Sequence, residues 1–574
     1  MIEFPPGLIL VVGALLMCFL RGSAWKAASL LLPLATLWGV WSVPDTPVAV
    51  PFLDYTLEVV SLQPATRVFA TIFSLMAFGG ALFALNQDRR VELPAAFVYA
   101  GSAIGVTFAG DLITLFIFWE MMAIGSTIVV WSGFGETARK AGMRYVNVHL
   151  VGGVLMMAGI VAHVLDTGSI DVVNLSSLDS AATWLILIGI LINAGAPPFG
   201  SWLPDAYPEA SESGMVFLSA FTTKTSVYVL MLLFAGTELL IYVGAAMAVY
   251  GIVYAILEND MRRILAYSII NQVGFMVCGI GIGTTMALNG AAAHAFAHII
   301  YKALLLMSAG SVVFMTGKRK CTDLGGLYHS MPITMWCGII GALSISAFPL
   351  TSGFTTKSMI SDAAAQEHLM LAWLVLTAAS AGVFLHAGIK FPWFVFFQKD
   401  SGLRPPDPPA NMKLAMIFFA GLCLLLGVYP QPLYEILPFP APPGEHLYAA
   451  YSGAHVVGQL QLLLFAGLAF FVLLPMLKRT LTITLDFDWF YRRFFPGLWL
   501  HVGLPLLRVL APLHTWIITG LPRSAVAYFG PNRARSSGPG RLQLGIGPAV
   551  LLLTGFLLLF VLLNLLDPST VPVR

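Results

Sequence analysis

Residues 293–304 read Ala-His-Ala-Phe-Ala-His-Ile-Ile-Tyr-Lys-Ala-Leu, an apolar stretch that carries three ionisable side chains. His294, His298 and Lys302 are spaced four residues apart, so a helix places all three along one face. A single buried histidine is usually a packed core residue, and a metal site would need a carboxylate or a cysteine to complete its ligands. Three titratable groups on one stripe of an apolar helix instead predict a proton relay inside a membrane.

The composition of the whole chain agrees with a membrane location for this helix. Of the 574 residues, 58% are hydrophobic and only 10% are charged, whereas a soluble protein carries about 25% charged residues. Several apolar runs approach the roughly 20 residues that cross a bilayer, among them Gly7–Leu20, Leu239–Ile256, Leu462–Leu477 and Ala549–Leu566. We therefore expect an all-α polytopic membrane protein whose residues 7–20 form a first transmembrane helix and not a cleaved signal peptide.

Several classes of function are disfavoured by the sequence. The net charge of +2 gives no basic surface for nucleic acid. The five cysteines are scattered without a CxxC pair, which argues against an iron–sulfur cluster, a zinc site or a disulfide framework. The sequence has no phosphate-binding loop and no dinucleotide fingerprint. We expect no cofactor and no resident metal, so the chain must draw its energy from an ion gradient or from a partner.

The basic residues predict how the chain crosses the membrane. About sixteen candidate spans can be placed. Most of the 30 Lys and Arg residues fall on alternate loops between them, as the positive-inside rule requires. These loops are predicted to be cytoplasmic, which puts both termini on the opposite side. Residues 497–520 are apolar but carry His501, Arg508 and His514, so we expect them to lie along the interface; if they span, the C-terminus changes sides.

Two further charges are predicted near the middle of spans, where a charged group costs at least about 2.5–3.5 kcal/mol. Glu120 follows Phe118 and Trp119, and Lys224 follows two threonines. We interpret Glu120 as a proton-binding carboxylate rather than a buried acid that a lysine neutralises. Lys224 is interpreted as a relay group, with the alternative that it is a structural counter-ion for Glu120.

Prolines that break helices accompany two other polar residues. Pro197 and Pro198 follow Asn193, and Pro392 follows Lys390. Interrupted helices at corresponding places in two halves of a chain are typical of inverted-repeat transporters, in which the transport path runs past the breaks. The sequence therefore predicts one interrupted helix near Asn193 and a second one near Lys390.

Three more residues are second-line candidates for the same path. Lys357 falls near a predicted helix end, where it is either an exit-side relay or a lysine whose ammonium reaches the membrane interface. His149, close to Tyr145, and His386, four residues before Lys390, lie in predicted spans and complete the set.

Five motifs carry a resemblance to a known family, namely Phe118-Trp-Glu120, Trp202–Ala210, Phe217–Thr225, Glu258–Tyr267 and His294–Lys302. With them the chain resembles the antiporter-like membrane subunits that respiratory complex I shares with the Mrp-type cation/proton antiporters. The resemblance covers roughly residues 70–430. The second and third motifs are most similar to the D subunit of the Mrp-type antiporters.

The resemblance implies a core of about fourteen helices with two inverted repeats of about five helices each, each repeat holding one discontinuous helix, plus extra C-terminal helices. It implies one proton half-channel per repeat, joined by a polar axis. By matching motifs, Glu120 would be the family's glutamate, Lys224 the bridging lysine of the first half and Lys302 the lysine of the central axis. Lys390 would stand on the second broken helix. Family members work in hetero-oligomers, typically in the bacterial inner membrane.

One departure from the family pattern concerns Asn193. Members usually carry a lysine at this position of the first broken helix, as a partner of the glutamate. Asparagine can form hydrogen bonds but cannot carry the proton or pair as a cation with Glu120. Either Lys224 takes over that pairing, or the first half-channel is altered or lost.

The expected domain organisation follows the two repeats. It consists of N-terminal transmembrane helices in residues 1–92, a first repeat in 93–235, a second repeat in 236–400, C-terminal core helices in 401–480, and a cytoplasmic or interfacial segment with the last transmembrane helix in 481–574. Within that last part, residues 486–495 and 532–541 are expected to be cytoplasmic loops.

The leading hypothesis is a proton-translocating subunit of a multi-subunit Na⁺ or K⁺/proton antiporter, which has a transport role and is not an enzyme. A second hypothesis is a proton-pumping membrane-arm subunit of an NADH:quinone oxidoreductase or hydrogenase-like complex. A third is a non-conducting scaffold, or a partner that energises another transport module. All three predict other membrane subunits as partners, in the cell inner membrane.

Overall fold

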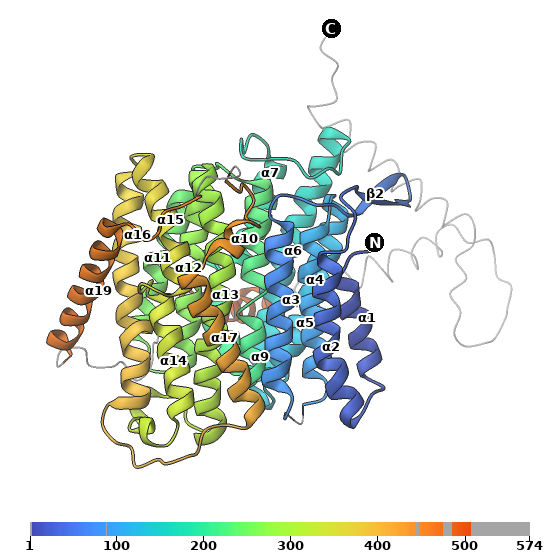
Figure 1. Cartoon of the computed structure of the whole chain (residues 1–574). Coiled ribbons are helices and arrows are strands. Elements are labelled where there is room, and N and C mark those ends of the chain that lie inside the picture. Colours follow the sequence, from blue (N-terminus) through green and yellow to red (C-terminus); the bar gives the residue numbers. More distant parts are fainter. Residues whose placement is uncertain (1–2, 88, 442–446, 475–484, 507–574) are drawn as a thin grey trace, which may run out of the picture. The chain divides into compact units, whose positions relative to one another are not determined.

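The computed structural model describes residues 3–87, 89–441, 447–474 and 485–506. The chain divides into two compact units, Met1–Asp488 and Trp489–Arg574. Within the described residues, ten helical segments are long and apolar enough to cross a membrane, and four shorter apolar helices accompany them. The expectation of an all-α polytopic membrane protein is confirmed (Figure 1).

The first part of the chain forms a hairpin of β1 (Val48–Phe52) and β2 (Tyr55–Val60) and a series of helices. They are α1 (Gly7–Met17), α2 (Gly22–Val40), α3 (Thr66–Ala84), α4 (Glu92–Phe108), α5 (Leu112–Trp131), α6 (Gly135–Thr167), α7 (Ala181–Ala194), α8 (Trp202–Ala206), η1 (Tyr207–Glu209), α9 (Glu212–Leu218) and α10 (Thr222–Leu233). The antiparallel hairpin, with Phe52 opposite Tyr55, was not predicted.

The second part of the first unit is also helical. Its elements are α11 (Leu239–Leu257), α12 (Met261–Ile282), α13 (Thr285–Thr316), η2 (Cys321–Asp323), η3 (Leu327–His329), α14 (Pro332–Ile345), α15 (Ser352–Gln366), α16 (Met370–Val383), the π-helical turns η4 (Phe384–Lys390) and η5 (Trp393–Phe397), α17 (Ala410–Val428), α18 (Gln431–Tyr434) and α19 (Gly453–Leu473).

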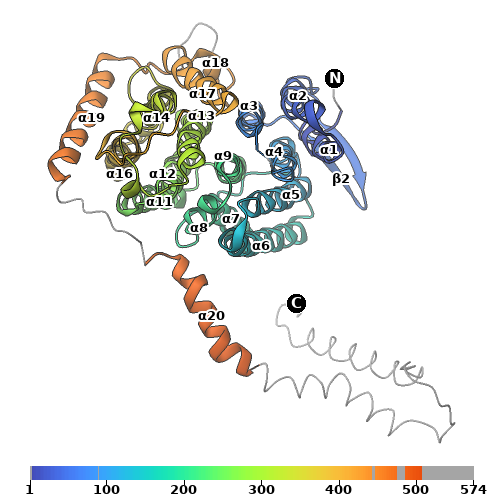
Figure 2. The same cartoon turned by 90° about the horizontal axis from the view of Figure 1, so that it is seen from below.

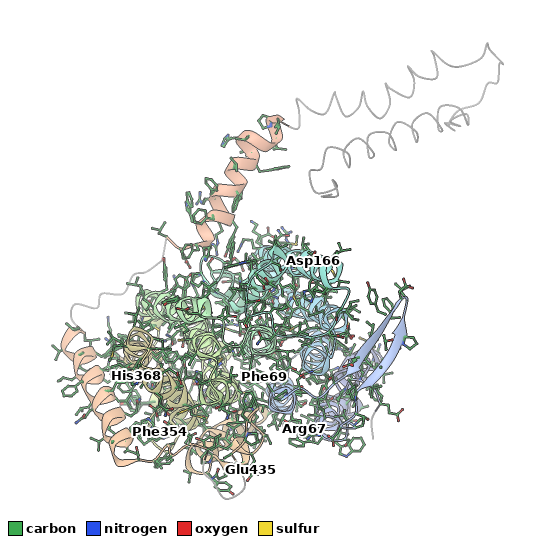
Figure 3. All side chains as sticks on the ribbon, turned by 90° about the horizontal axis from the view of Figure 1, so that it is seen from above. Arg67, Phe69, Asp166, Phe354, His368 and Glu435 are labelled. Carbon is green, nitrogen blue, oxygen red and sulfur yellow. The ribbon has the colours of Figure 1, made fainter. Side chains whose placement is uncertain are left out.

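Seen along the helices, the first unit consists of two neighbouring groups (Figure 2). One group contains α4 to α8, and the other contains α11, α12, α14 and α16. The long helix α13 lies between them, and it contacts α3 and α9 on one side and α12, α14, α15 and α17 on the other. Helix α12 is buried along its length, whereas α19 is mostly exposed. Apolar side chains such as Phe69 fill the interior (Figure 3).

Two of the central helices begin at polar side chains that the sequence provides. The carboxylate of Asp260 accepts hydrogen bonds from the backbone N–H groups of Arg262 and Arg263 at the start of α12. Helix α12 ends at Gly283, whose φ of 75° suits a residue without a side chain. The hydroxyl of Thr284 then caps the first turn of α13. This short connection places α12 and α13 side by side.

Of the two expected interruptions, the one after Asn193 is present and the one near Lys390 is not. Helix α7 ends at Ala194, and helical structure resumes only at Trp202, as the prolines after Asn193 predicted. An interruption that was not predicted separates α14 from α15, where Ala347 and Leu350 adopt positive φ angles of 56° and 71°. Such angles are unfavourable for residues with a side chain, so the surrounding structure must hold this turn in place.

The segment around Pro392 is therefore a correction to the sequence prediction. Residues 370–397 form one continuous helical span, because α16 passes into the π-helical turns η4 and η5. Pro392 lies between the two π-helical turns, and such local adjustments let a membrane helix accommodate a proline. Lys390 thus stands on a continuous helical span, and Lys357 stands on α15, which follows the interruption after α14.

The C-terminal predictions are only partly covered. Residues 490–503 are helical, in η6 (Phe490–Phe494), α20 (Phe495–Leu498) and η7 (Trp499–Gly503), so the loop expected over 486–495 is helical from Phe490 onward. Residues 507–520, the loop expected at 532–541 and the last expected span lie outside the described residues.

Candidate functional site

The three predicted residues of α13 line one buried face of that helix. His294, His298 and Lys302 are each 0% exposed. The two imidazole rings are 6.1 Å apart, and both lie near the ring of Tyr301. None of the four imidazole nitrogens has a hydrogen-bond partner among the described residues. Buried polar atoms without partners are costly, so these two histidines are unlike ordinary core residues.

The ammonium groups of Lys302 and Lys224 are held by neutral oxygens. Lys302 donates to the hydroxyl of Ser268 on α12 (2.8 Å). Lys224 donates to the carbonyl of Ser219 (2.7 Å) and to the hydroxyl of Thr223 (3.0 Å). The Ser219 carbonyl is available because the chain is interrupted between α9 and α10. Neither lysine forms a salt bridge within the described part of the chain.

These side chains are close enough for their charges to interact. Lys224 interacts electrostatically with Lys302, and His298 interacts with both lysines. His294 interacts with Lys224 and with Lys357. The ionisable side chains along α13 therefore interact with Lys224 on α10 and with Lys357 on α15.

Lys357 lies at the interruption between α14 and α15. Its ammonium donates to the carbonyl of Ile345, the last residue of α14 (3.3 Å), and lies 5.4 Å from the ring centre of Phe275. The side chain is only 3% exposed. This burial and the hydrogen bond to Ile345 favour the relay interpretation over an ammonium at the membrane interface, and the role of Lys357 stays a prediction.

Lys390 and His386 lie on η4, one turn apart. Nδ1 of His386 hydrogen-bonds to the carbonyl of Gly382 (2.8 Å). The ammonium of Lys390 donates to the carbonyls of Ala255 (3.2 Å), Ile256 (2.6 Å) and Glu258 at the C-terminal end of α11. His386 interacts electrostatically with both Lys390 and Lys302, so it connects Lys390 to the axis.

Glu120 occupies a different position from the lysines. It is half-buried on α5, and its carboxylate lies against Gly153 of α6. The described residues include no salt bridge between Glu120 and Lys224. The alternative in which Lys224 replaces the missing lysine partner of Glu120 therefore has no support in the geometry. Asn193 is buried in the last turn of α7, next to His149.

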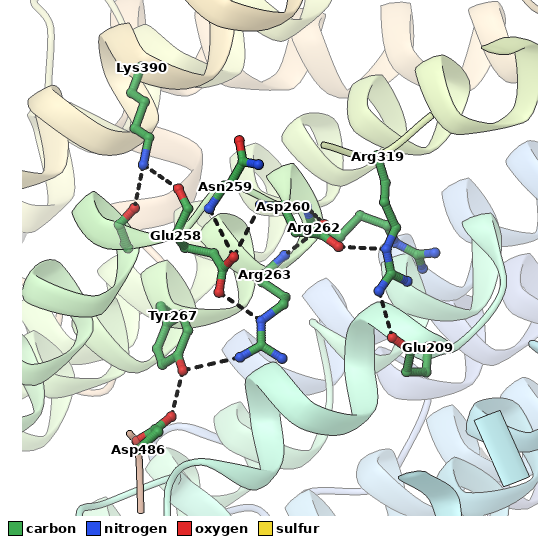
Figure 4. A network of polar contacts seen from close by, with 11 residues as sticks. Glu209, Glu258, Asn259, Asp260, Arg262, Arg263, Tyr267, Arg319, Lys390 and Asp486 are labelled. Carbon is green, nitrogen blue, oxygen red and sulfur yellow. Dashed lines mark hydrogen bonds and ion pairs between the residues drawn. The ribbon is translucent and has the colours of Figure 1, made fainter. Parts of the chain in front are cut away.

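A second polar network lies at the end of α11 and the start of α12 (Figure 4). Arg319 forms salt bridges with Glu209 (2.9 Å) and Asp260 (2.6 Å). Burial raises the pKa of Asp260, although Arg319 and Arg262 oppose this effect. For Glu209, burial is outweighed by Arg319, which holds the pKa of that carboxyl below its usual value.

The same network holds the end of the first unit. The carboxylate of Asp486 accepts hydrogen bonds from the hydroxyls of Tyr250 (2.6 Å) and Tyr267 (2.5 Å). Arg263, which pairs with Glu258 (2.8 Å), lies against the ring of Tyr267. No motif in the sequence connects Asp486 with this region, because the residues are more than two hundred positions apart.

Several residues of the axis were missed by the sequence reasoning. They are Ser268 and Gln272 on α12 and Tyr301 on α13. Ser268 accepts a hydrogen bond from Lys302, and Gln272 accepts one from the hydroxyl of Tyr301 (3.0 Å). A signal was present, because Asn271 and Gln272 form a pair of amides in the middle of an apolar span. In the described part of the chain, no group of three or more His, Cys, Asp or Glu side chains is arranged to hold a metal ion.

Comparison with known proteins places this arrangement in a family. The family model described as NADH:quinone oxidoreductase/Mrp antiporter, TM matches residues 109–383. The probable K⁺/H⁺ antiporter A/B subunit of Rhizobium meliloti is 29% identical over 63% of this chain, which spans 40% of that longer protein. The D subunit of the Na⁺/H⁺ antiporter of Alkalihalophilus pseudofirmus is 26% identical over 69% of this chain and 83% of its own length. The N subunit of the NADH-quinone oxidoreductase of Desulforudis audaxviator is 32% identical over 63% of this chain and 77% of its own length.

Solved structures show the same fold. A chain of the Mrp complex from Dietzia sp. DQ12-45-1b superposes with a TM-score of 0.66 at 21% identity, over 76% of this chain and 96% of that one. A chain of the membrane-bound sulfane sulfur reductase, an archaeal respiratory membrane complex, superposes with a TM-score of 0.72 at 23% identity, over 98% and 100% of the two chains. The chain therefore belongs to the family of membrane subunits shared by NADH:quinone oxidoreductases and Mrp antiporters.

Proposed function

We propose that this chain is a proton-translocating subunit of a multi-subunit monovalent cation/proton antiporter. The observation that carries the proposal is the set of buried lysines Lys224, Lys302 and Lys357, which neutral oxygens hold inside membrane helices. A charged group at the centre of a bilayer costs at least about 2.5–3.5 kcal/mol. Lysines without a carboxylate partner within the described residues do not stabilise the fold by ion pairing, so a transport role accounts for them better.

The proposed proton path begins in the first repeat and ends in the second. A proton enters near Glu120, passes to Lys224, moves along His298 and Lys302, and leaves through the region of Lys357 and Lys390. Two unit charges 4 Å apart interact by about 4 kcal/mol at an effective dielectric constant of 20. Lys224 and Lys302 interact electrostatically, so a proton on one disfavours a proton on the other.

A membrane assay of the complete assembly tests the proposal. Everted vesicles that carry the whole operon are energised to form a pH gradient, and Na⁺ or K⁺ is then added. We expect the cation to dissipate the gradient in the wild type, and Glu120→Gln to abolish this response while the subunits still copurify. The exposed Glu136, which pairs with Arg139 at the start of α6, gives a matched control as Glu136→Gln. Wild-type dissipation with Glu120→Gln would refute the proposed path.

A second candidate is a proton-pumping subunit of a redox-driven membrane complex. It is favoured by the 32% identity to a relative that is named as part of an NADH-quinone oxidoreductase. The same vesicles distinguish the two functions, because a redox pump forms a gradient only when a reductant is supplied. Copurification with flavin or iron–sulfur subunits would identify this class.

The remaining parts of the proposal concern placement. We infer that the chain lies in the cell inner membrane with both termini on the non-cytoplasmic side, since the Lys- and Arg-rich loops alternate. Residues 93–235 and 236–400 would be the two repeats, each with an interrupted helix. The nature of the exchanged cation follows from the same vesicle assay, by comparing Na⁺ with K⁺.

A further inference from the structure

We propose that His149 is the proton-carrying group of the first repeat, acting with Asn193 in place of a lysine. The inference rests on the proposed function and deepens it, because it identifies which group carries protons beside the uncharged Asn193. The evidence for it comes from one turn of α6, His149–Gly153, because α6 packs against both α5 and α7.

The imidazole of His149 is enclosed by polar and aromatic groups. It is 2% exposed, and its ring centre lies 4.1 Å from that of Tyr145 and 4.6 Å from that of Trp202. Its side chain interacts with that of Asn193. Nε2 of His149 and Oδ1 of Asn193 nevertheless have no hydrogen-bond partner of good geometry among the described residues. Two unsatisfied polar atoms on neighbouring side chains are expected where protons are exchanged, and not in a passive core.

Two glycines bring the neighbouring helices to the same turn. A Cβ atom at Gly153 would collide with Oε1 of Glu120 on α5. A Cβ atom at Gly152 would lie 3.2 Å from Oδ1 of Asn193 on α7. Because Gly152 and Gly153 follow His149 by three and four residues, all three lie on adjacent parts of the helix surface. The carboxylate of Glu120 and the amide of Asn193 therefore approach the turn that carries His149.

A polar approach to His149 exists on the Arg144 side. Arg144 forms a two-pronged salt bridge with Asp205 of α8 (2.7 and 2.8 Å). The next residue, Tyr145, donates a hydrogen bond to the hydroxyl of Ser126 (2.9 Å) and packs against His149. This order of groups leads from the basic first turns of α6, which also carry Arg139 and Lys140, toward His149.

The chemistry suits a histidine better than the asparagine beside it. An imidazole can bind a proton on one nitrogen and release it again, whereas an amide cannot carry a positive charge. In the proposed step, Nε2 of His149 accepts a proton from the Tyr145 side, and the resulting imidazolium gives it up toward the carboxylate of Glu120. Asn193 orients the ring, and the rings of Tyr145 and Trp202 pack against it.

The test uses the complete assembly in everted vesicles, with the rate of cation-driven dissipation as the readout. We expect His149→Gln to lower this rate by about tenfold or more, as for the loss of a proton-transfer group, while the subunits copurify normally. Asn193→Lys added to His149→Gln should restore much of the rate, because it returns a titratable group to the same turn. His163→Gln changes another buried histidine of the same helix and should leave the rate unchanged.

The outcomes separate this inference from the proposed function. A wild-type rate with His149→Gln, together with a loss in Glu120→Gln, would overturn the inference and leave the proposed function standing. Retained transport in Glu120→Gln would refute the proposed path itself. If His149→Gln fails to assemble, Asn193→Leu provides the second variant, since it keeps the histidine and removes its amide partner. A severalfold loss with that variant supports the inference, and a wild-type rate overturns it.

Discussion

At the scale of single residues, the charged side chains of the axis are stabilised by dipoles and not by opposite charges. Lys224, Lys302 and Lys357 all donate to hydroxyl or carbonyl oxygens. Neutral partners hold an ammonium without removing its net charge, which allows a lysine to change its protonation state. The sequence predicted Lys224 and Lys302 from their place in apolar spans and Lys357 from its place near a helix end. It could not predict their oxygen partners, because those depend on how separate helices pack.

Ser268 provides a test of this arrangement. Its hydroxyl is the hydrogen-bond partner that the structure gives to the ammonium of Lys302, and a hydrogen bond to a charged group contributes about 1.5–3 kcal/mol. We expect Ser268→Ala to slow cation-driven dissipation in everted vesicles by about tenfold, without loss of assembly. Ser308→Ala removes another buried hydroxyl of the region, which donates to the backbone carbonyl of Thr334, and should transport normally. Equal rates in both variants would contradict the role of Ser268.

At the scale of helices, the apolar spans were predicted well and the interrupted helices less well. The interruption after Asn193 was recognisable from two adjacent prolines, and it is present. The second interruption contains a single proline, Pro349, and was overlooked because α15 is short and carries polar residues such as Lys357. Pro392 suggested a break, but the helix continues there through the π-helical turns η4 and η5. Proline identity alone cannot distinguish a break from a wider turn, since neighbouring helices decide which one forms.

Lys390 also has a structural role at this scale. Its ammonium caps the C-terminal end of α11 by binding three carbonyls, and a cation is favourable at that end of a helix. We expect Lys390→Met to destabilise the protein by about 1–3 kcal/mol, seen as a lower melting temperature of the purified assembly in detergent. Lys390→Arg keeps the charge and the hydrogen-bond donors, so it should lower the melting temperature less than Lys390→Met does. Lys413→Met, on the half-buried face of α17, serves as the control. An unchanged melting temperature with Lys390→Met would show that the cap does not stabilise α11.

At the scale of the whole first unit, ionic contacts join the two groups of helices at one end. Glu209 follows α8, and Asp260 precedes α12, so Arg319 connects the expected first repeat with the expected second one. The sequence predicted the basic character of this end from the positive-inside pattern. It did not predict which carboxylates pair with the basic residues, because Glu209, Asp260 and Arg319 come together only when the two groups of helices pack.

Removing Arg319 should loosen this connection in a way that depends on pH. Arg319→Gln leaves Asp260 buried without its closest cation, at a cost of about 1–3 kcal/mol, so the melting temperature of the assembly falls at neutral pH. The lowered pKa of Glu209 means that its contribution is present at neutral pH and is lost as the pH falls through that value. The pKa of Asp260 is raised, so the burial of its carboxyl costs less free energy once acidification protonates it, with or without Arg319.

Both effects reduce the benefit of Arg319 in acid. The difference in melting temperature between wild type and Arg319→Gln should therefore be largest near pH 7 and should shrink toward pH 4. Arg404→Gln breaks an exposed salt bridge with Asp400, and such pairs contribute little, so this variant should melt like the wild type at both pH values. A constant difference across the pH range would mean that Arg319 stabilises the end of the helices through packing of its side chain, and not through the two carboxylates.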